Sequence, residues 1–142
     1  MTASFEPIIG RYMHLDLFGR KHRIYVEEAG EGTPLLCLHT AGADGRQYRA
    51  LLNEARITRR HRVIAFDMPW HGKSSPPAGW HEEEYQLTSA QYTTMILEIV
   101  AAMELDGVLP IADRGRGHAG KIPGSLRTQP GSACGNARVP AG

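Results

Sequence analysis

Three histidines have side chains suited to acid–base or metal chemistry, because the imidazole pKa lies near neutral pH. His39, His71 and His81 are separated by 32 and 10 residues, and neither interval matches the ligand spacing of a compact zinc site. His39 ends an apolar run, whereas the other two stand beside Trp70 and Trp80 in a polar stretch. We therefore expect His39 to hold a loop by a hydrogen bond and the other two to be exposed, with no metal ion bound.

Two glycine-containing segments look like phosphate-binding loops, but their surroundings argue against that function. Residues 115–120 read G-R-G-H-A-G and match G-x-G-x-x-G letter for letter. Such a loop must follow a strand and open a helix, yet Pro110 precedes it and Pro123 interrupts the helix. Residues 72–74 end like a Walker A loop, but Asp67 stands where its first glycine is required. We expect no nucleotide and no other cofactor.

Composition excludes several classes of partner. The chain has 142 residues, 42% hydrophobic residues and a formal charge of +1, so nothing attracts it broadly to nucleic acid or to an anionic membrane. Cys37 and Cys134 form no C-x-x-C pair, and Cys37 between two leucines suits a small buried hydrophobe. The first ten residues do not resemble a secretory signal, and no apolar run reaches the about 20 residues of a membrane helix. These features predict a cytoplasmic protein with no nucleic-acid or membrane partner.

Hydrophobic periodicity predicts four strands that would position these residues. Alternation with a period of two predicts strands at 11–17 and 23–27, which Gly19 would join into a hairpin. Unbroken apolar runs predict strands at 35–39 and 62–67 that are buried on both faces.

Two helices complete the predicted order of elements. Asp44 is placed to cap a helix whose apolar residues begin with Tyr48. This helix lies between the two buried strands, which predicts a right-handed parallel crossover. Thr88 and Gln91 form a capping box before a second amphipathic helix at 89–105. The fold class is therefore α/β, with an antiparallel hairpin followed by a parallel β-α-β-α unit.

Two of these segments resemble the α/β-hydrolase family. Residues 34–48, PLLCLHTAGADGRQY, resemble its third strand and oxyanion loop, which commonly carries H-G-x after the strand. Residues 62–75, RVIAFDMPWHGKSS, resemble its fourth strand and D-x-P-G-x-G-x-S turn. The resemblance covers roughly residues 10–106 and implies part of an α/β-hydrolase sheet. It also implies a serine-type enzyme that hydrolyses ester or acyl bonds of small molecules.

The resemblance implies a remnant of the oxyanion loop at His39, Thr40 and Ala41. The backbone N–H of Ala41 would be one donor to the negative charge that develops during acyl transfer. Thr40 stands where the family usually has glycine after the histidine, and Trp70 stands where it usually has glycine after Pro69. The side chain of Thr40 restricts the backbone conformations of the loop at the point where the substrate carbonyl oxygen must approach closely.

The last 36 residues differ in composition from the first 106. Residues 1–106 hold 14 acidic and 11 basic residues, whereas residues 107–142 hold one and five, with eight of the 16 glycines and four of the nine prolines. The nucleophile elbow G-x-S-x-G is absent, since neither Ser125 nor Ser132 has both flanking glycines. We expect residues 1–106 to be the N-terminal part of an α/β-hydrolase domain and residues 107–142 to be disordered or out of frame.

Three functional hypotheses follow from this division. The first is a hydrolase whose reading frame is lost near Asp106, which leaves an inactive, truncated fragment without the triad. A strand with G-x-S-x-G in another frame of the gene would support it. The second is a small non-catalytic binding or interaction protein whose basic tail binds an acidic partner. The third is a hydrolase that is completed by a second chain.

Truncation would also have a structural consequence. Without the family's fifth strand, residues 35–38 would form an unpaired apolar edge that invites self-association. Missing helices would leave one sheet face uncovered and would expose parts of Leu36, Val63 or Ala65.

Overall fold

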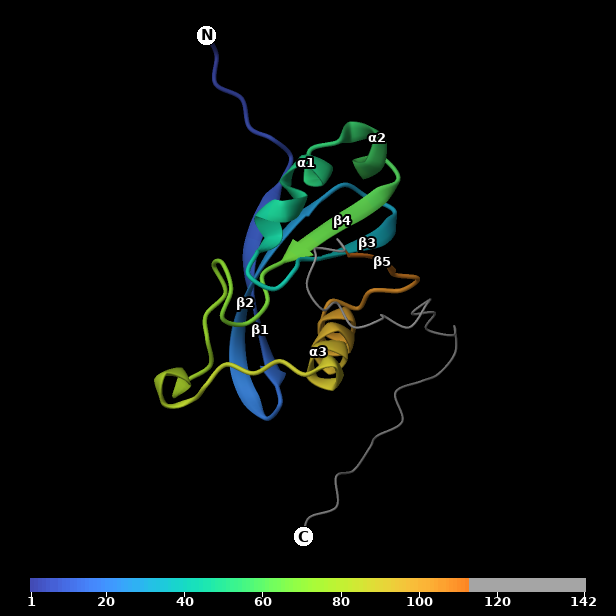
Figure 1. Cartoon of the computed structure of the whole chain (residues 1–142). Helices are drawn as coiled ribbons and strands as arrows, with labels where there is room; N and C mark the ends of the chain where they lie inside the picture. The colour runs from blue at the N-terminus through green and yellow to red at the C-terminus, as the bar shows by residue number, and fades with distance from the viewer. Residues whose placement is uncertain (113–142) are drawn as a thin grey trace.

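A five-stranded mixed sheet forms the centre of the protein in a computed structural model that describes residues 1–112 (Figure 1). Its strands are β1 (Ile9–Leu17), β2 (Arg20–Ala29), β3 (Thr33–Leu38), β4 (His61–Phe66) and β5 (Leu109–Ala112). The spatial order is β1-β2-β4-β3-β5. β1, β2 and β4 pair antiparallel, whereas β3 pairs parallel with both β4 and β5. The predicted hairpin followed by parallel strands is confirmed.

Helices cover both faces of this sheet (Figure 1). The helices of the described residues are η1 (Gly45–Tyr48), α1 (Arg49–Leu52), α2 (Ala55–Thr58), η2 (Trp80–Glu82) and α3 (Ser89–Ala102), where η denotes a 3-10 helix. The short helices between β3 and β4 pack on one face, and α3 packs on the other. No helix among residues 1–112 has the length and apolar character needed to cross a membrane.

Two helical layers explain why β3 has no polar residue between Leu35 and Leu38. Leu35 and Cys37 face the short helices, whereas Leu36 and Leu38 face α3. β4 alternates in the same way. The expectation of an uncovered sheet face is wrong, because both Leu36 and Val63 are 0% exposed.

α3 begins at the predicted capping box. The Thr88 hydroxyl accepts a hydrogen bond from the Gln91 N–H at 3.2 Å, and the Gln91 side chain accepts one from the Thr88 N–H at 2.9 Å. The helix ends at Ala102, shortly before Glu104 adopts a left-handed φ of 52°. Its buried residues are Met95, Ile96, Ile99 and Val100, whose spacing places them on one face of the helix, as an amphipathic helix requires.

A fifth strand follows α3, beyond the boundary expected at Asp106. Leu35 to Leu38 of β3 pair in register with Leu109 to Ala112 of β5. The expected unpaired edge at residues 35–38 is therefore wrong, because β3 is an interior strand. Pro110 lowers the strand signal of this segment, but proline is tolerated in β5, the last strand of the described sheet.

Residues 113–142 lie outside the described part of the chain. The G-x-G-x-x-G match at 115–120, both serines of the tail and Cys134 fall there. The expected division at residue 106 and the disordered or out-of-frame tail stay predictions.

Candidate functional site

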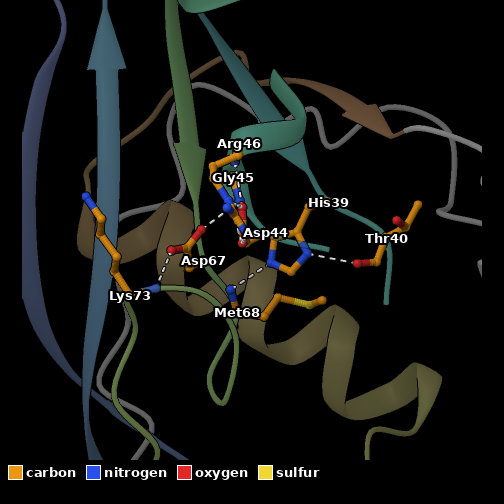
Figure 2. Close-up of polar contacts among 8 residues, drawn as sticks. All are labelled: His39, Thr40, Asp44, Gly45, Arg46, Asp67, Met68 and Lys73. Carbon is orange, nitrogen blue, oxygen red and sulfur yellow. Dashed lines mark hydrogen bonds and ion pairs between the residues drawn. The ribbon is translucent and has the colours of Figure 1, made fainter. Parts of the chain in front are cut away.

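His39 joins the loops that follow β3 and β4. It is 3% exposed, and its Nδ1 lies 3.0 Å from the Thr40 carbonyl oxygen while its Nε2 lies 2.9 Å from the Met68 N–H nitrogen (Figure 2). Only the neutral tautomer with a proton on Nδ1 satisfies both contacts, because Nε2 must accept from Met68. Burial lowers the pKa of His39, although the Thr40 carbonyl acts in the opposite direction. The expected hydrogen-bonding role of His39 is confirmed.

The two residues after His39 differ in how their backbone N–H groups are used. The Thr40 N–H donates to the side-chain oxygen of Gln47 at 3.1 Å, and the Thr40 carbonyl accepts from Ala43 at 3.0 Å. No hydrogen bond within residues 1–112 uses the N–H of Ala41, which is an exposed residue. Gln47 is absent from the sequence-based site. Gln47 stands three residues after the cap Asp44, a position that predicts a contact with the Asp44 N–H, so the local signal does not point to Thr40.

The carboxylate of Asp67 connects the same two loops at a second point. Asp67 is 5% exposed, and its oxygens accept hydrogen bonds from the Gly45 N–H at 2.7 Å and the Lys73 N–H at 2.8 Å (Figure 2). The Ser74 hydroxyl donates to the Asp67 carbonyl at 2.6 Å and accepts from the Tyr25 N–H at 2.9 Å. Asp67 and Ser74 thus link η1, the turn after β4, and β2.

Two glycines allow the backbone to approach this carboxylate. A Cβ atom on Gly72 would lie 2.3 Å from one Asp67 oxygen, and a Cβ atom on Gly45 would lie 3.0 Å from the other. Gly72 also has a φ of 51°, in the left-handed region that favours glycine. The Asp67 carboxylate therefore leaves no room for a Cβ atom at position 72 and little room for one at position 45.

Asp44 begins η1 as the sequence predicts. Its carboxylate accepts from the Arg46 N–H at 2.9 Å and from the Arg46 guanidinium, also at 2.9 Å. Hydrogen bonding to the Arg46 side chain is the main reason why the pKa of Asp44 falls to about 2. The helix expected here starts as a 3-10 turn and continues as α1.

Aromatic rings gather in the segment after β4. Trp70 lies with its ring centroid 5.7 Å from that of Trp80 and 5.6 Å from that of Tyr85. The ring of His71 lies 5.6 Å from Tyr85 and 5.2 Å from His39. The expectation of exposure is correct for His81, which is exposed, and wrong for His71, which is partly buried by these rings.

The described residues offer few groups for covalent or metal chemistry. Cys37 is 1% exposed, and burial raises the pKa of its thiol to about 12, so the thiolate is scarce at neutral pH. The Ser74 hydroxyl is held by the Asp67 carbonyl. No group of three His, Cys, Asp or Glu side chains within residues 1–112 is arranged to hold a metal ion.

The sequence is similar to that of one kind of characterised enzyme. A curated relative, 2-hydroxy-6-oxo-6-(2'-aminophenyl)hexa-2,4-dienoic acid hydrolase from Metapseudomonas resinovorans, is 31% identical over 93 residues, which are 65% of this chain and 30% of that protein. No family model matches the sequence.

Solved structures share the arrangement of strands and helices. A haloalkane dehalogenase from Agrobacterium tumefaciens matches with a TM-score of 0.56 and 20% identity, over 72% of this chain and 32% of that one. An epoxide hydrolase from Vigna radiata matches with a TM-score of 0.58 and 22% identity, over 78% and 33%. An N-acyl homoserine lactonase matches with a TM-score of 0.57 and 27% identity, over 72% and 35%. The chain is an α/β-hydrolase-fold protein. This α/β-hydrolase-fold protein spans about a third of the length of the proteins it matches.

We expect Gly72→Ala to destabilise the α/β-hydrolase-fold protein more than Gly42→Ala. Both glycines have positive φ, but an added Cβ at Gly42 meets no atom within 4 Å. The left-handed backbone alone should cost about 1 to 2 kcal/mol in Gly42→Ala. The clash with Asp67 should raise the loss to about 2 to 5 kcal/mol in Gly72→Ala. Urea denaturation measures both, and equal losses would contradict a tight contact at Asp67.

Stability should fall on mild acidification because His39 is held neutral. Its folded pKa lies below the unfolded value of about 6.5, so below that pH the unfolded state binds a proton that the folded state refuses. The free energy of unfolding should therefore decline as the pH falls from about 7 toward the folded pKa. Urea denaturation at several pH values should show a flatter profile for His39→Gln than for His81→Gln, which alters an exposed histidine. Identical profiles would refute the neutral assignment.

Proposed function

We propose that residues 39–41 form the oxyanion loop of an ester- or acyl-bond hydrolase, with the backbone N–H of Ala41 as a donor. The observation that supports this proposal is that the neighbouring N–H groups of Thr40 and Ala41 differ in their hydrogen bonding. Thr40 donates to Gln47, whereas the Ala41 N–H has no partner within residues 1–112. The loop begins at the carboxyl end of β3, where active sites of α/β sheets form. An N–H held in such a loop stabilises charge that develops on a substrate oxygen.

The proposed substrate is a small molecule with an ester-like bond. The printed names of the matched proteins are a dienoic acid hydrolase, a dehalogenase, an epoxide hydrolase and a lactonase. All of these act on small molecules, and the proposal extends that property to this chain. Which bond is cleaved depends on groups that face the loop from the rest of such a domain.

We further propose that the 142 residues by themselves are catalytically inactive. The sequence contains no G-x-S-x-G elbow. Cys37 is buried with a raised pKa, and the Ser74 hydroxyl is bound to a backbone carbonyl. Neither is an activated nucleophile, since each lacks a neighbouring base and access to a substrate.

A chimera tests the donor role of Ala41. Residues 1–112 would be joined to the corresponding remainder of the 31% identical hydrolase, which supplies the other catalytic groups. Ala41→Pro removes the N–H and should lower kcat by about 100- to 1000-fold, whereas Ala41→Gly keeps the N–H and should change kcat little. An active chimera in which Ala41→Pro has no effect on kcat would show that Ala41 is not a donor.

An ester assay tests the inactivity of the chain. Release of p-nitrophenol from p-nitrophenyl acetate should be equally slow for the purified chain and for the double variant Ser125→Ala, Ser132→Ala. Equal rates are expected because neither serine belongs to an elbow. A rate that falls in the double variant would overturn the proposed inactivity.

A further inference from the structure

A hollow of about 290 Å³ lies between the tip of the β1–β2 hairpin, the segment after β4, and the start of α3. In Figure 1 the chain runs from η2 past this hairpin to α3. Phe18, Trp70 and Tyr85 line the hollow, together with Met68 and Met95. The volume is at the small end of ligand pockets, which run from about 300 to 1,000 Å³. None of residues 39–41 lines this hollow, although its lining residue Met68 donates a hydrogen bond to His39.

The backbone of Trp70 has a strained conformation, and Trp70 lines this hollow. Its φ of 72° lies in the left-handed region, where a non-glycine residue costs about 1 to 3 kcal/mol. Glycine would occupy the same backbone without that cost. The strained conformation places the indole against Trp80 and Tyr85. Strain that is retained around a ligand-sized hollow is typical of a binding position.

The charges around the hollow favour a cation. The Arg20 guanidinium donates two hydrogen bonds of 2.8 Å to the Glu83 carboxylate, so these two charges compensate each other. Glu84 also lines the hollow, and its carboxylate has no hydrogen bond or ion pair within residues 1–112. The remaining titratable groups in the wall are Tyr85, whose pKa is raised by burial, and His22, which is 6% exposed and has Nδ1 2.9 Å from the Arg20 carbonyl oxygen. Glu84 is an exposed residue, and it leaves the lining with one uncompensated carboxylate that attracts positive charge.

We propose that this hollow binds a small organic cation of the alkylammonium class. Aromatic faces attract a cation that carries apolar substituents, since such a cation loses little hydration on entering. Phe18, Trp70 and Tyr85 supply the rings, and Glu84 supplies the counter-charge. A bare inorganic cation does not fit this wall, because hard cations require several oxygen ligands.

Choline and its neutral carbon analogue, 3,3-dimethyl-1-butanol, test the proposal with two ligands of the same shape. The sequence contains two tryptophans, Trp70 and Trp80, and their rings are in contact, so intrinsic fluorescence reports on this wall. Choline should change the fluorescence of the full chain saturably. The neutral analogue should bind about tenfold more weakly, because it lacks the charge. A neutral analogue that binds as tightly as choline, or no saturable change with choline, would overturn the proposal.

Matched variants locate the bound cation. Glu84→Gln removes the counter-charge and should weaken choline binding several-fold, while Glu82→Gln changes a neighbouring acid with an 80% exposed side chain and should not. Trp70→Gly removes the ring and relieves the left-handed strain, so choline binding should be lost while the thermal unfolding transition persists. Binding to this variant is measured by isothermal titration calorimetry, because the substitution removes one of the two reporter tryptophans. Choline binding that is unchanged in Glu84→Gln and Trp70→Gly would refute this site.

Discussion

The buried carboxylate of Asp67 is the constraint on which the carboxyl edge of the sheet depends. A charge that is 5% exposed must be fully hydrogen-bonded, and its donors come from two different loops, at Gly45 and at Lys73. Charge-assisted bonds of this kind are short and directional. These hydrogen bonds therefore fix the loop after β3 relative to the turn after β4. The close approach also explains why Gly45 and Gly72 lack side chains.

His39 adds a second connection between the same loops. A neutral imidazole bridges the Thr40 carbonyl and the Met68 N–H, so residues 39 and 68 cannot separate without leaving buried polar groups unpaired. The Gln47 side-chain oxygen then accepts a hydrogen bond from the Thr40 N–H and holds the residue after His39. Together these contacts hold the loop before any substrate arrives, as electrostatic preorganisation requires.

The second departure from the family pattern, Trp70, has a different physical consequence. Its indole forms part of an aromatic cluster with Trp80 and Tyr85 beside α3 and the hairpin. This cluster is partly exposed, with Trp80 48% and Tyr85 41% accessible. The two departures from the family pattern thus lie in different loops. Thr40 lies in the proposed oxyanion loop, and Trp70 lies in the segment after β4 and lines the hollow.

The sequence by itself determined the features that depend on near neighbours in the chain. Period-two alternation, unbroken apolar runs and the caps at Asp44 and Thr88 were sufficient to predict the hairpin, β3, β4, η1 with α1, and α3, because these signals act within a few residues. Only the tertiary structure decided the contacts between distant segments. Pro110 concealed β5, whose pairing with β3 overturned the expected edge. Contacts between loops also depend on how the sheet brings distant segments together. These contacts include the donors to Asp67, the partner of Thr40 and the hollow beside Trp70. Local sequence patterns do not predict them, because the contacting residues lie farther apart in the chain than those patterns extend.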